Sequence, residues 1–290
     1  MIIWDSAAYS HADDNLLRCY ESVPGFKRRD FTEHRHTAFE LSLICSGSGI
    51  YRIGGKQVPI RKGDIFFFAT NEVHCITEVS EGEEMRLLNL QFEPRLLWEA
   101  GENFGGDSLA DFFPGQSKRI PNRIQVDLPL AKQITPMIIG IKEEALEHHD
   151  AYDLMMKTSL LQILVMLMRE FSDHDSSMAR HVRPANYKSI TNALDLIHQK
   201  LGETITLDEL AAEADMSRTY FCSVFKKLNG ITPWEYINIK RIEKAKQLLR
   251  ATQKTVLEIS LECGFNNLSH FNRVFLRITA QKPSDYRKHI

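Results

Sequence analysis

The sequence lacks the features that define several common protein classes. Its 290 residues include only five cysteines, Cys19, Cys45, Cys75, Cys222 and Cys263, and none forms a CxxC pair. An odd number of scattered cysteines predicts neither a disulfide framework nor a zinc site, and it favours a reducing, cytoplasmic location. The longest uncharged apolar stretch in the middle of the chain, Thr158 to Met168, has 11 residues, whereas a membrane span needs about 20. The N-terminus has no basic segment followed by a long apolar run, so we expect no signal peptide and no membrane partner.

The chain also lacks a strong net charge, with 36 Lys and Arg against 38 Asp and Glu and a sum of −2. By itself, this balance disfavours a uniformly basic nucleic-acid-binding protein. The charge is unevenly distributed, however, because residues 1–184 carry a net charge of −7 and residues 185–290 carry +5. A polar segment that ends in Pro184, residues 172–184, is typical of a linker at this boundary. The C-terminal part is therefore the candidate for binding an acidic partner.

Residues 1–126 are expected to form a domain that is mainly β structure. Short runs rich in β-branched and aromatic residues alternate with Gly turns, and these runs are Glu40–Cys45, Ile50–Ile53, Gln57–Ile60, Asp64–Phe68, Cys75–Val79 and Met85–Phe92. Several short strands at close, even spacing predict a sandwich or barrel. The last part of this domain, residues 94–126, indicates a mixture of helix and loop.

Helical patterns follow. Residues 127–171 contain two expected helices, Leu130–His149 and Tyr152–Phe171, and the second is apolar on nearly all sides, which predicts that it is buried. Residues 185–290 contain no strand-like run. The fold class predicted from these patterns is α+β with two domains, a β-barrel with trailing helices and an all-α C-terminal domain.

The C-terminal domain contains an internal repeat with an offset of fifty residues. Two apolar stripes with i, i+3, i+4, i+7 spacing correspond, namely Phe221, Val224, Phe225 and Leu228, and Phe271, Val274, Phe275 and Ile278. Each stripe follows an N-cap residue, Ser217 or Asn267, and a shorter helix that opens with a capping box, at Thr206 or Thr255. A short helix, a tight turn and a second helix form a helix-turn-helix. We therefore expect two such units, at about 206–229 and 255–279.

A helix that reads DNA is held by its buried face, while its opposite face offers donors and acceptors to base edges in the major groove. The candidate residues on these opposite faces are Arg218, Thr219, Cys222, Ser223 and Lys226 in the first unit, and Leu268, Ser269, Asn272 and Arg273 in the second, with His270 on the flank. A long helix expected over Thr232–Ala251 can fix the spacing between the units. The alternative is a pair of amphipathic hairpins in a helical bundle. That alternative does not explain why the two copies match in their caps and apolar stripes.

The N-terminal domain contains a second candidate site. Strand alternation places His34 and His36 on one face, with Glu40 on that face in the same or an adjoining strand, and His74 follows later in the chain. Two imidazoles and a carboxylate can bind a metal, hydrogen-bond a polyhydroxy ligand, or make only structural hydrogen bonds at a barrel rim.

The string from His34 to Glu40 resembles the first cupin motif, and Gly55 with the Arg61–Asp64 segment resembles part of the second. Enzyme-type cupins place a histidine soon after the position of Gly63, where this chain has Phe66. The departure disfavours a metal-dependent enzyme and favours a small-molecule sensor with His34, His36, Glu40 and His74 as ligand-binding residues.

Residues 187–290 resemble the AraC/XylS family of bacterial transcription regulators. The matching motifs include Gly230–Ile231–Thr232–Pro233, Arg241–Ile242–Glu243–Lys244–Ala245, Ser269–His270–Phe271 and Arg273–Val274–Phe275. Two departures lie in one turn, where Ala280 replaces the usual Gly and Lys282 the usual Thr. The resemblance implies a DNA-binding regulator, with activation favoured, that binds double-stranded promoter DNA and RNA polymerase, needs no cofactor and is not an enzyme.

The resemblance also implies roles for individual residues. Most of the exposed positions named above approach bases, Arg218 and Lys226 look more like phosphate contacts, and Arg273 can pair with guanine. The helices of 127–171 resemble a dimerisation region, with Leu154, Leu161, Leu164, Val165 and Met168 facing the partner in a homodimer. The implied effector is a small molecule, with a sugar favoured. The competing hypotheses are a metal-dependent cupin enzyme fused to a DNA-binding domain, and a ligand-independent regulator whose barrel is only a dimerisation scaffold.

Overall fold

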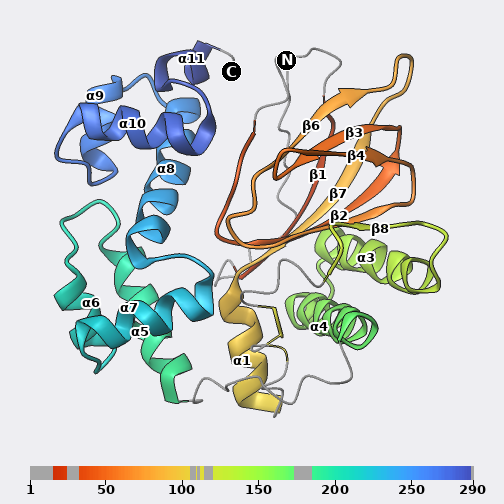
Figure 1. Cartoon of the computed structure of the whole chain (residues 1–290), viewed down its shortest axis with the longest axis horizontal. Helices are drawn as coiled ribbons and strands as arrows, with labels where there is room; N and C mark the ends of the chain where they lie inside the picture. The colour runs from red at the N-terminus through yellow and green to blue at the C-terminus, as the bar shows by residue number, and fades with distance from the viewer. Residues whose placement is uncertain are drawn as a thin grey trace. The chain divides into compact units, whose positions relative to one another are not determined.

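The computed structural model describes residues 16–24, 33–104, 109, 112–113, 120–172 and 185–288 (Figure 1). Contacts divide them into two compact units. Residues 16–24 and 38–172 form the barrel unit, and residues 33–37 and 185–288 form the helical unit. Within the described residues, none of the helices combines the length and the apolar character that a membrane span requires.

The barrel unit contains two antiparallel sheets. The strands are β1 (Leu17–Ser22), β2 (Phe39–Ser46), β3 (Gly49–Ile53), β4 (Lys56–Ile60), β5 (Ile65–Phe68), β6 (His74–Val79), β7 (Arg86–Phe92) and β8 (Arg123–Ile124). They form a five-stranded sheet in the order β1-β7-β2-β5-β8 and a three-stranded sheet in the order β4-β3-β6. The six runs predicted from the sequence correspond to β2 to β7. The prediction omitted β1, whose charged and apolar residues alternate without a strong β signature, and the two-residue β8, which forms only by pairing with β5.

A glycine pair makes the tightest of the hairpins. Gly54 and Gly55 have φ values of 53° and 83°, and they join Ile53 of β3 directly to its partner Lys56 of β4. A two-residue hairpin turn of type I′ needs positive φ at both central positions, which glycine adopts without a steric penalty.

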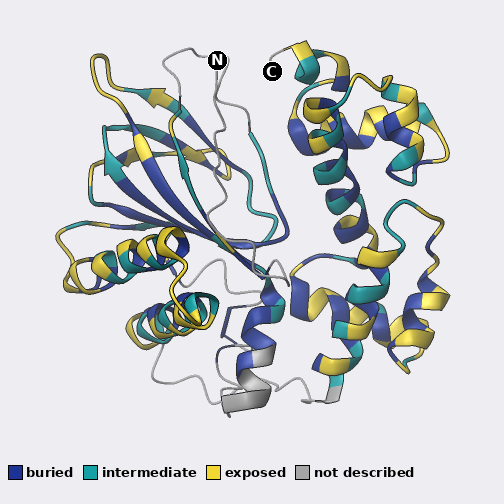
Figure 2. Ribbon diagram, turned by 180° about the vertical axis from the view of Figure 1, so that it is seen from behind, coloured by how far each residue is buried: buried dark blue, intermediate teal, exposed yellow. Residues whose placement is uncertain are grey.

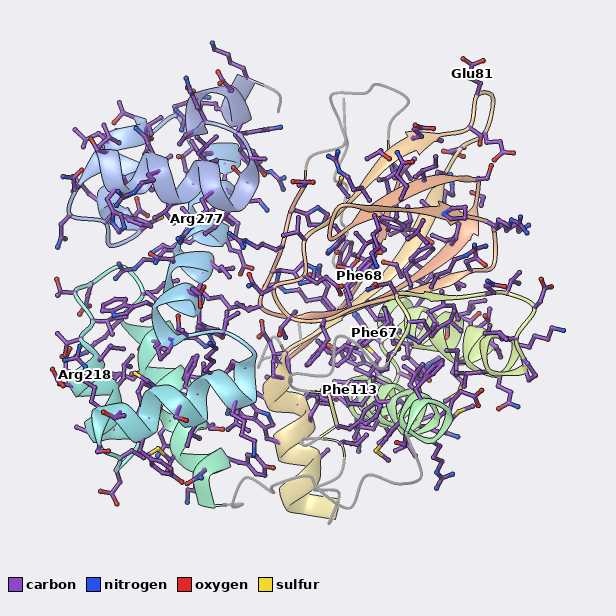
Figure 3. All side chains as sticks on the ribbon, viewed as in Figure 1. Phe67, Phe68, Glu81, Phe113, Arg218 and Arg277 are labelled. Carbon is purple, nitrogen blue, oxygen red and sulfur yellow. The ribbon has the colours of Figure 1, made fainter. Side chains whose placement is uncertain are left out.

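The pleat gives the five-stranded sheet two different faces, as the neighbours Phe67 and Phe68 of β5 illustrate (Figure 3). Phe67 packs on one face with Phe39 and Phe113, whose ring centroids lie 5.9 and 5.8 Å away. Phe68 lies on the other face, in a buried cluster with Tyr51 of β3 and residues of β4, β6 and β7. Because this cluster joins residues of both sheets, it forms the core between them.

Three helices complete the described part of the barrel unit: α1 (Pro94–Phe104), α3 (Pro129–Glu147) and α4 (Tyr152–Phe171). Helices α3 and α4 pack together, and each has a buried and an exposed side (Figure 2). The expectation that α4 is buried on nearly all sides is wrong. One stripe is buried, Met156, Leu160, Ile163, Leu164 and Leu167, whereas Leu154 and Met155 are 57% and 52% exposed.

The helical unit contains, in its described residues, α5 (Ala185–Gln199), α6 (Leu207–Glu213), α7 (Arg218–Asn229), α8 (Pro233–Ala251), α9 (Val256–Glu262), α10 (Leu268–Thr279) and α11 (Pro283–Lys288). The internal repeat recurs in its packing. The Phe221 and Phe225 ring centroids are 5.6 Å apart, as are those of Phe271 and Phe275. The second ring of each pair meets a tyrosine edge-on, Tyr236 at 5.6 Å or Tyr286 at 5.7 Å.

The turn that departs from the family pattern keeps the repeated geometry. Gly230 ends α7 with φ 74°, and Ala280 ends α10 with φ 55°. Both residues are in the left-handed region, which costs a residue with a Cβ about 1–2 kcal/mol. The chain therefore tolerates strain at Ala280 that it avoids at Gly230.

We predict that Ala280→Gly raises the free energy of unfolding by about 0.5–1 kcal/mol, because relief of the strain exceeds the entropy that glycine adds to the unfolded chain. Urea unfolding of the full chain measures this change. Gly230→Ala is the matched control and is expected to lower stability. A decrease for Ala280→Gly would contradict the left-handed assignment.

Candidate DNA-reading helices and ligand site

The first helix-turn-helix is positioned by local hydrogen bonds. The Thr206 hydroxyl accepts from the Glu209 N–H while the Glu209 carboxylate accepts from the Thr206 N–H, so that a capping box begins α6. Asp215 turns the chain with φ 50°, and the Ser217 hydroxyl then accepts from the Tyr220 N–H at the start of α7. The two cap residues predicted from the sequence, Thr206 and Ser217, therefore begin the two helices of this unit.

Burial of the apolar stripe of α7 determines which side of this helix reaches solvent. Phe221, Val224, Phe225 and Leu228 are buried. Of the residues predicted to contact DNA, Arg218, Thr219, Ser223 and Lys226 are exposed and Cys222 is half-buried. Arg218 (Figure 3) also lies 3.5 Å from the exposed Asp208 carboxylate of α6. All five side chains are accessible, and their contact with DNA stays a prediction.

The second helix-turn-helix repeats this arrangement with a different cap. The Asn267 side-chain oxygen accepts from the backbone N–H groups of Ser269 and His270, at 2.8 and 3.2 Å, and begins α10. Its stripe, Phe271, Val274, Phe275 and Ile278, is buried. Ser269, His270, Asn272 and Arg273 are exposed, and Leu268 is half-buried.

The exposed side of α10 is electropositive. Partial burial lowers the pKa of His270, and the cations Arg273, Arg277 and Arg241 lower it further. The imidazole is therefore neutral near pH 7, where it offers one donor and one acceptor. The positive charge of Arg273 and Arg277 attracts phosphate groups to this face. It also keeps His270 neutral, so that the ring can both donate and accept a hydrogen bond.

The barrel unit contains a buried polar cluster on the inner face of its larger sheet. Glu40 and Ser42 of β2 lie directly opposite Gln91 and Asn89 of β7. The Gln91 amide donates to the Glu40 carboxylate at 2.6 Å, and the Ser42 hydroxyl lies 2.8 Å from Glu40 and 2.6 Å from the Asn89 oxygen. The single hydroxyl hydrogen of Ser42 therefore lies between two acceptor oxygens, those of Glu40 and Asn89.

Two tyrosines are close to this cluster. Burial, followed by the Glu40 carboxylate, raises the pKa values of Tyr20 and Tyr51 well above their ordinary value. Both phenols therefore remain protonated and can donate hydrogen bonds.

His74 is also held inside the barrel unit. It is 1% exposed, and its ring stacks on Phe68 with centroids 3.9 Å apart and planes 8° from parallel. Its Nδ1 lies 2.9 Å from the Glu72 carbonyl oxygen, which can only accept. In the neutral form Nδ1 therefore carries the proton, and Nε2 presents the lone pair.

His34 and His36 do not lie in a regular strand, contrary to the strand alternation expected from the sequence. Strand β2 begins only at Phe39, after a bend at Thr37–Ala38, so the two histidines precede the strand that carries Glu40. Their rings are 6.2 Å apart, and contacts assign them to the helical unit, whereas Glu40 and His74 belong to the barrel unit. Binding of a ligand or a metal by these four residues stays a prediction.

The position where an enzyme-type cupin has its later histidine is part of the core. Phe66 is fully buried, and its ring centroid lies 4.6 Å from that of Tyr51. Ser42, Asn89 and Gln91 of the polar cluster were not predicted from the sequence. The missed signal was the occurrence of polar residues at i and i+2 in otherwise apolar strands, Glu40 with Ser42 and Asn89 with Gln91.

Comparisons with known proteins match both units. Residues 23–164 match the model of the AraC-like ligand binding domain, and residues 210–289 match that of a helix-turn-helix domain. The chain belongs to the AraC family of transcription regulators. The resemblance stated from the sequence is thereby confirmed, as is the α+β fold with a cupin-like domain and a helical domain.

Full-length relatives have the same organisation. The chain is 24% identical over 287 residues to the HTH-type transcriptional activator RhaS of Shigella flexneri, covering 96% of each protein, and 23% identical over 272 residues to RhaS of Escherichia coli. Among solved structures, ToxT of Vibrio cholerae matches with a TM-score of 0.60 at 14% identity, covering 94% of this chain and 98% of ToxT. ToxT with a bound unsaturated fatty acid matches with a TM-score of 0.57, at 14% identity and 94% coverage of each chain. These relatives are transcription regulators and not enzymes.

We predict that the His270 imidazole titrates below about 6.5, its ordinary value. Arg273→Ala is expected to raise the midpoint, because it removes the cation that lowers the pKa of His270 the most. An NMR titration measures the midpoint. Because the unfolded chain binds the proton first as the pH falls, His270 makes the fold less stable below about pH 6.5. The control is Arg250→Ala, which leaves these cations unchanged. A midpoint at or above 6.5 would contradict the lowering of the His270 pKa by burial and the neighbouring arginines.

Proposed function

We propose that this protein is a transcriptional activator that binds promoter DNA through α7 and α10 and responds to a neutral polar small molecule, such as a sugar. The observation that carries the DNA-binding part is the pair of matched helices, each with one face buried and the other exposed, in a unit of net charge +5. Two such helices in one chain suit two major-groove segments about one helical turn apart. The name of RhaS favours activation.

The polar cluster of the barrel unit supports the proposed effector class. Glu40 is 4% exposed, and Ser42 and Gln91 are among its hydrogen-bond partners. A buried carboxylate favours a ligand that brings hydroxyl donors over one that brings a second negative charge. ToxT binds an unsaturated fatty acid. A test of the effector class therefore compares polyhydroxy compounds with an unsaturated fatty acid.

The proposed assembly is a homodimer formed through α3 and α4. Exposed apolar residues occur on both helices, Ile139 and Leu146 on α3 and Leu154 and Met155 on α4. The sequence analysis placed Leu164 in this interface, but Leu164 is fully buried within the unit and cannot face a partner. RNA polymerase remains the proposed partner for activation.

We predict that Arg273→Ala lowers the affinity for the operator by about 1–3 kcal/mol and relaxes the preference at one base pair, because Arg273 is exposed on α10 and can pair with guanine. The operator is first obtained by selection from random DNA. Binding is then measured on the operator and on single-base variants. Arg277→Ala, which removes one cation from the same helix, is the control. If Arg273→Ala lowers the affinity equally for every DNA sequence, Arg273 contacts a phosphate and does not read a base.

We predict that a sugar or polyol raises the unfolding temperature of the protein. Glu40→Gln is expected to raise the ligand concentration needed for a given shift about tenfold or more, because a hydrogen bond to a charged acceptor contributes about 1.5–3 kcal/mol to the binding free energy. Glu78→Gln, at an exposed position of β6, is the matched control. The panel contains sugars, polyols and an unsaturated fatty acid. A shift with the fatty acid alone would overturn the effector class, and no shift with any compound would favour a ligand-independent scaffold.

A further inference from the structure

Arg241 is an arginine in the interior of the helical unit. It lies on α8, the helix between the two helix-turn-helix units, and its side chain is 7% exposed. Arginine is almost never buried to this degree without partners, since a desolvated charge is costly. Its contacts therefore indicate what the burial achieves.

On one side Arg241 holds the first helix-turn-helix. Its Nε donates to the Leu201 carbonyl at 3.0 Å, and its Nη2 donates to the Glu203 carbonyl at 2.6 Å. Both carbonyls lie in the turn that follows α5 and leads into the capping box of α6. The guanidinium thus fixes the backbone immediately before the first unit.

On the other side Arg241 meets the second helix-turn-helix. The guanidinium carbon lies 5.6 Å from the centre of the Phe265 ring, within the range of a cation–π interaction. Phe265 is in the turn between α9 and α10. Next to it, Gly264 has φ 80°, and a Cβ added there would lie 2.8 Å from both the Arg241 Nη2 and the Leu201 oxygen.

The two turns also approach each other directly. A Cβ added to Gly202, in the turn before α6, would lie 2.8 Å from the Glu262 carbonyl oxygen at the end of α9. Lys244, three residues after Arg241, donates to this same carbonyl at 3.2 Å. Arg241 therefore lies where the backbones of the two helix-turn-helices come close together. It makes hydrogen bonds to the segment before the first and a ring contact with the second.

We infer that Arg241 sets the distance between the two DNA segments that the chain reads, by fixing one helix-turn-helix against the other. The inference rests on the proposed binding of DNA by α7 and α10. Arg241 is a positioning residue and does not contact DNA, since it is buried. A planar guanidinium can donate along its edge and stack on its face at once, which a lysine ammonium cannot.

The test is Arg241→Lys in the full chain, which keeps the positive charge and removes the planar fork. Affinity is measured on the selected bipartite operator, on operators with one base pair inserted or removed between the two elements, and on DNA with one element. We expect a loss of about tenfold on the native spacing, a smaller loss on the altered spacings and no change on one element. The preference for one spacing therefore decreases.

The matched control is Arg250→Lys, on the same helix. Arg250 makes the same two kinds of contact with Tyr286, a hydrogen bond of 2.5 Å and a cation–π contact at 5.4 Å, but both contacts join α8 to α11 and do not link the two helix-turn-helices. We expect this variant to keep the spacing preference. If Arg241→Lys fails to fold by circular dichroism, Phe265→Leu removes the ring contact with similar apolar volume and is expected to reduce the preference in the same way.

Equal losses on every DNA, or an unchanged spacing preference in a folded variant, would overturn the inference. Failure of the unaltered protein to select any DNA would instead overturn the proposed function, so the two failures are distinguishable.

Discussion

The packing of two phenylalanines on α7 and two on α10, with a tyrosine against the second ring of each pair, is the interaction on which the helical unit depends. In both repeats the phenylalanines are buried and the tyrosine meets the second ring edge-on at nearly the same distance. Because one side of α7 and of α10 packs in this core, the other side faces solvent. The face proposed to read DNA is thus a consequence of core packing, and the caps at Ser217 and Asn267 set where each helix begins.

The barrel unit follows the opposite principle, since its candidate site interrupts its core. The inner face of the larger sheet is apolar at Ile44 and Phe66 and becomes polar at Ser42 and Glu40. Buried polar groups are stable only when they are hydrogen-bonded, and here the partners come from the neighbouring strand β7. A ligand that replaces or adds to these hydrogen bonds changes the stability of the barrel, which is the physical basis of the proposed sensing.

The sequence predicted the parts of the fold that local patterns determine. Six strands, the capping boxes and the repeated stripes follow from alternation, helical periodicity and cap residues within a few positions. The parts it did not predict depend on long-range pairing. Strand β1 forms against β7, seventy residues later, the bend at Thr37–Ala38 separates His36 from Glu40, and Gln91 meets Glu40 only through strand register. The role of Arg241 depends on turns that lie about forty residues before it and twenty residues after it.

Hydroxyl-radical footprinting of the full-length protein on its selected operator shows whether one chain reads two segments of DNA. For each bound chain we expect two protected windows on one face of the duplex, separated by about 10–10.5 base pairs. One window is expected to disappear when α10 carries Arg273→Ala and Asn272→Ala. A single window for each chain, unchanged by these substitutions, would contradict the proposal that one chain reads two segments.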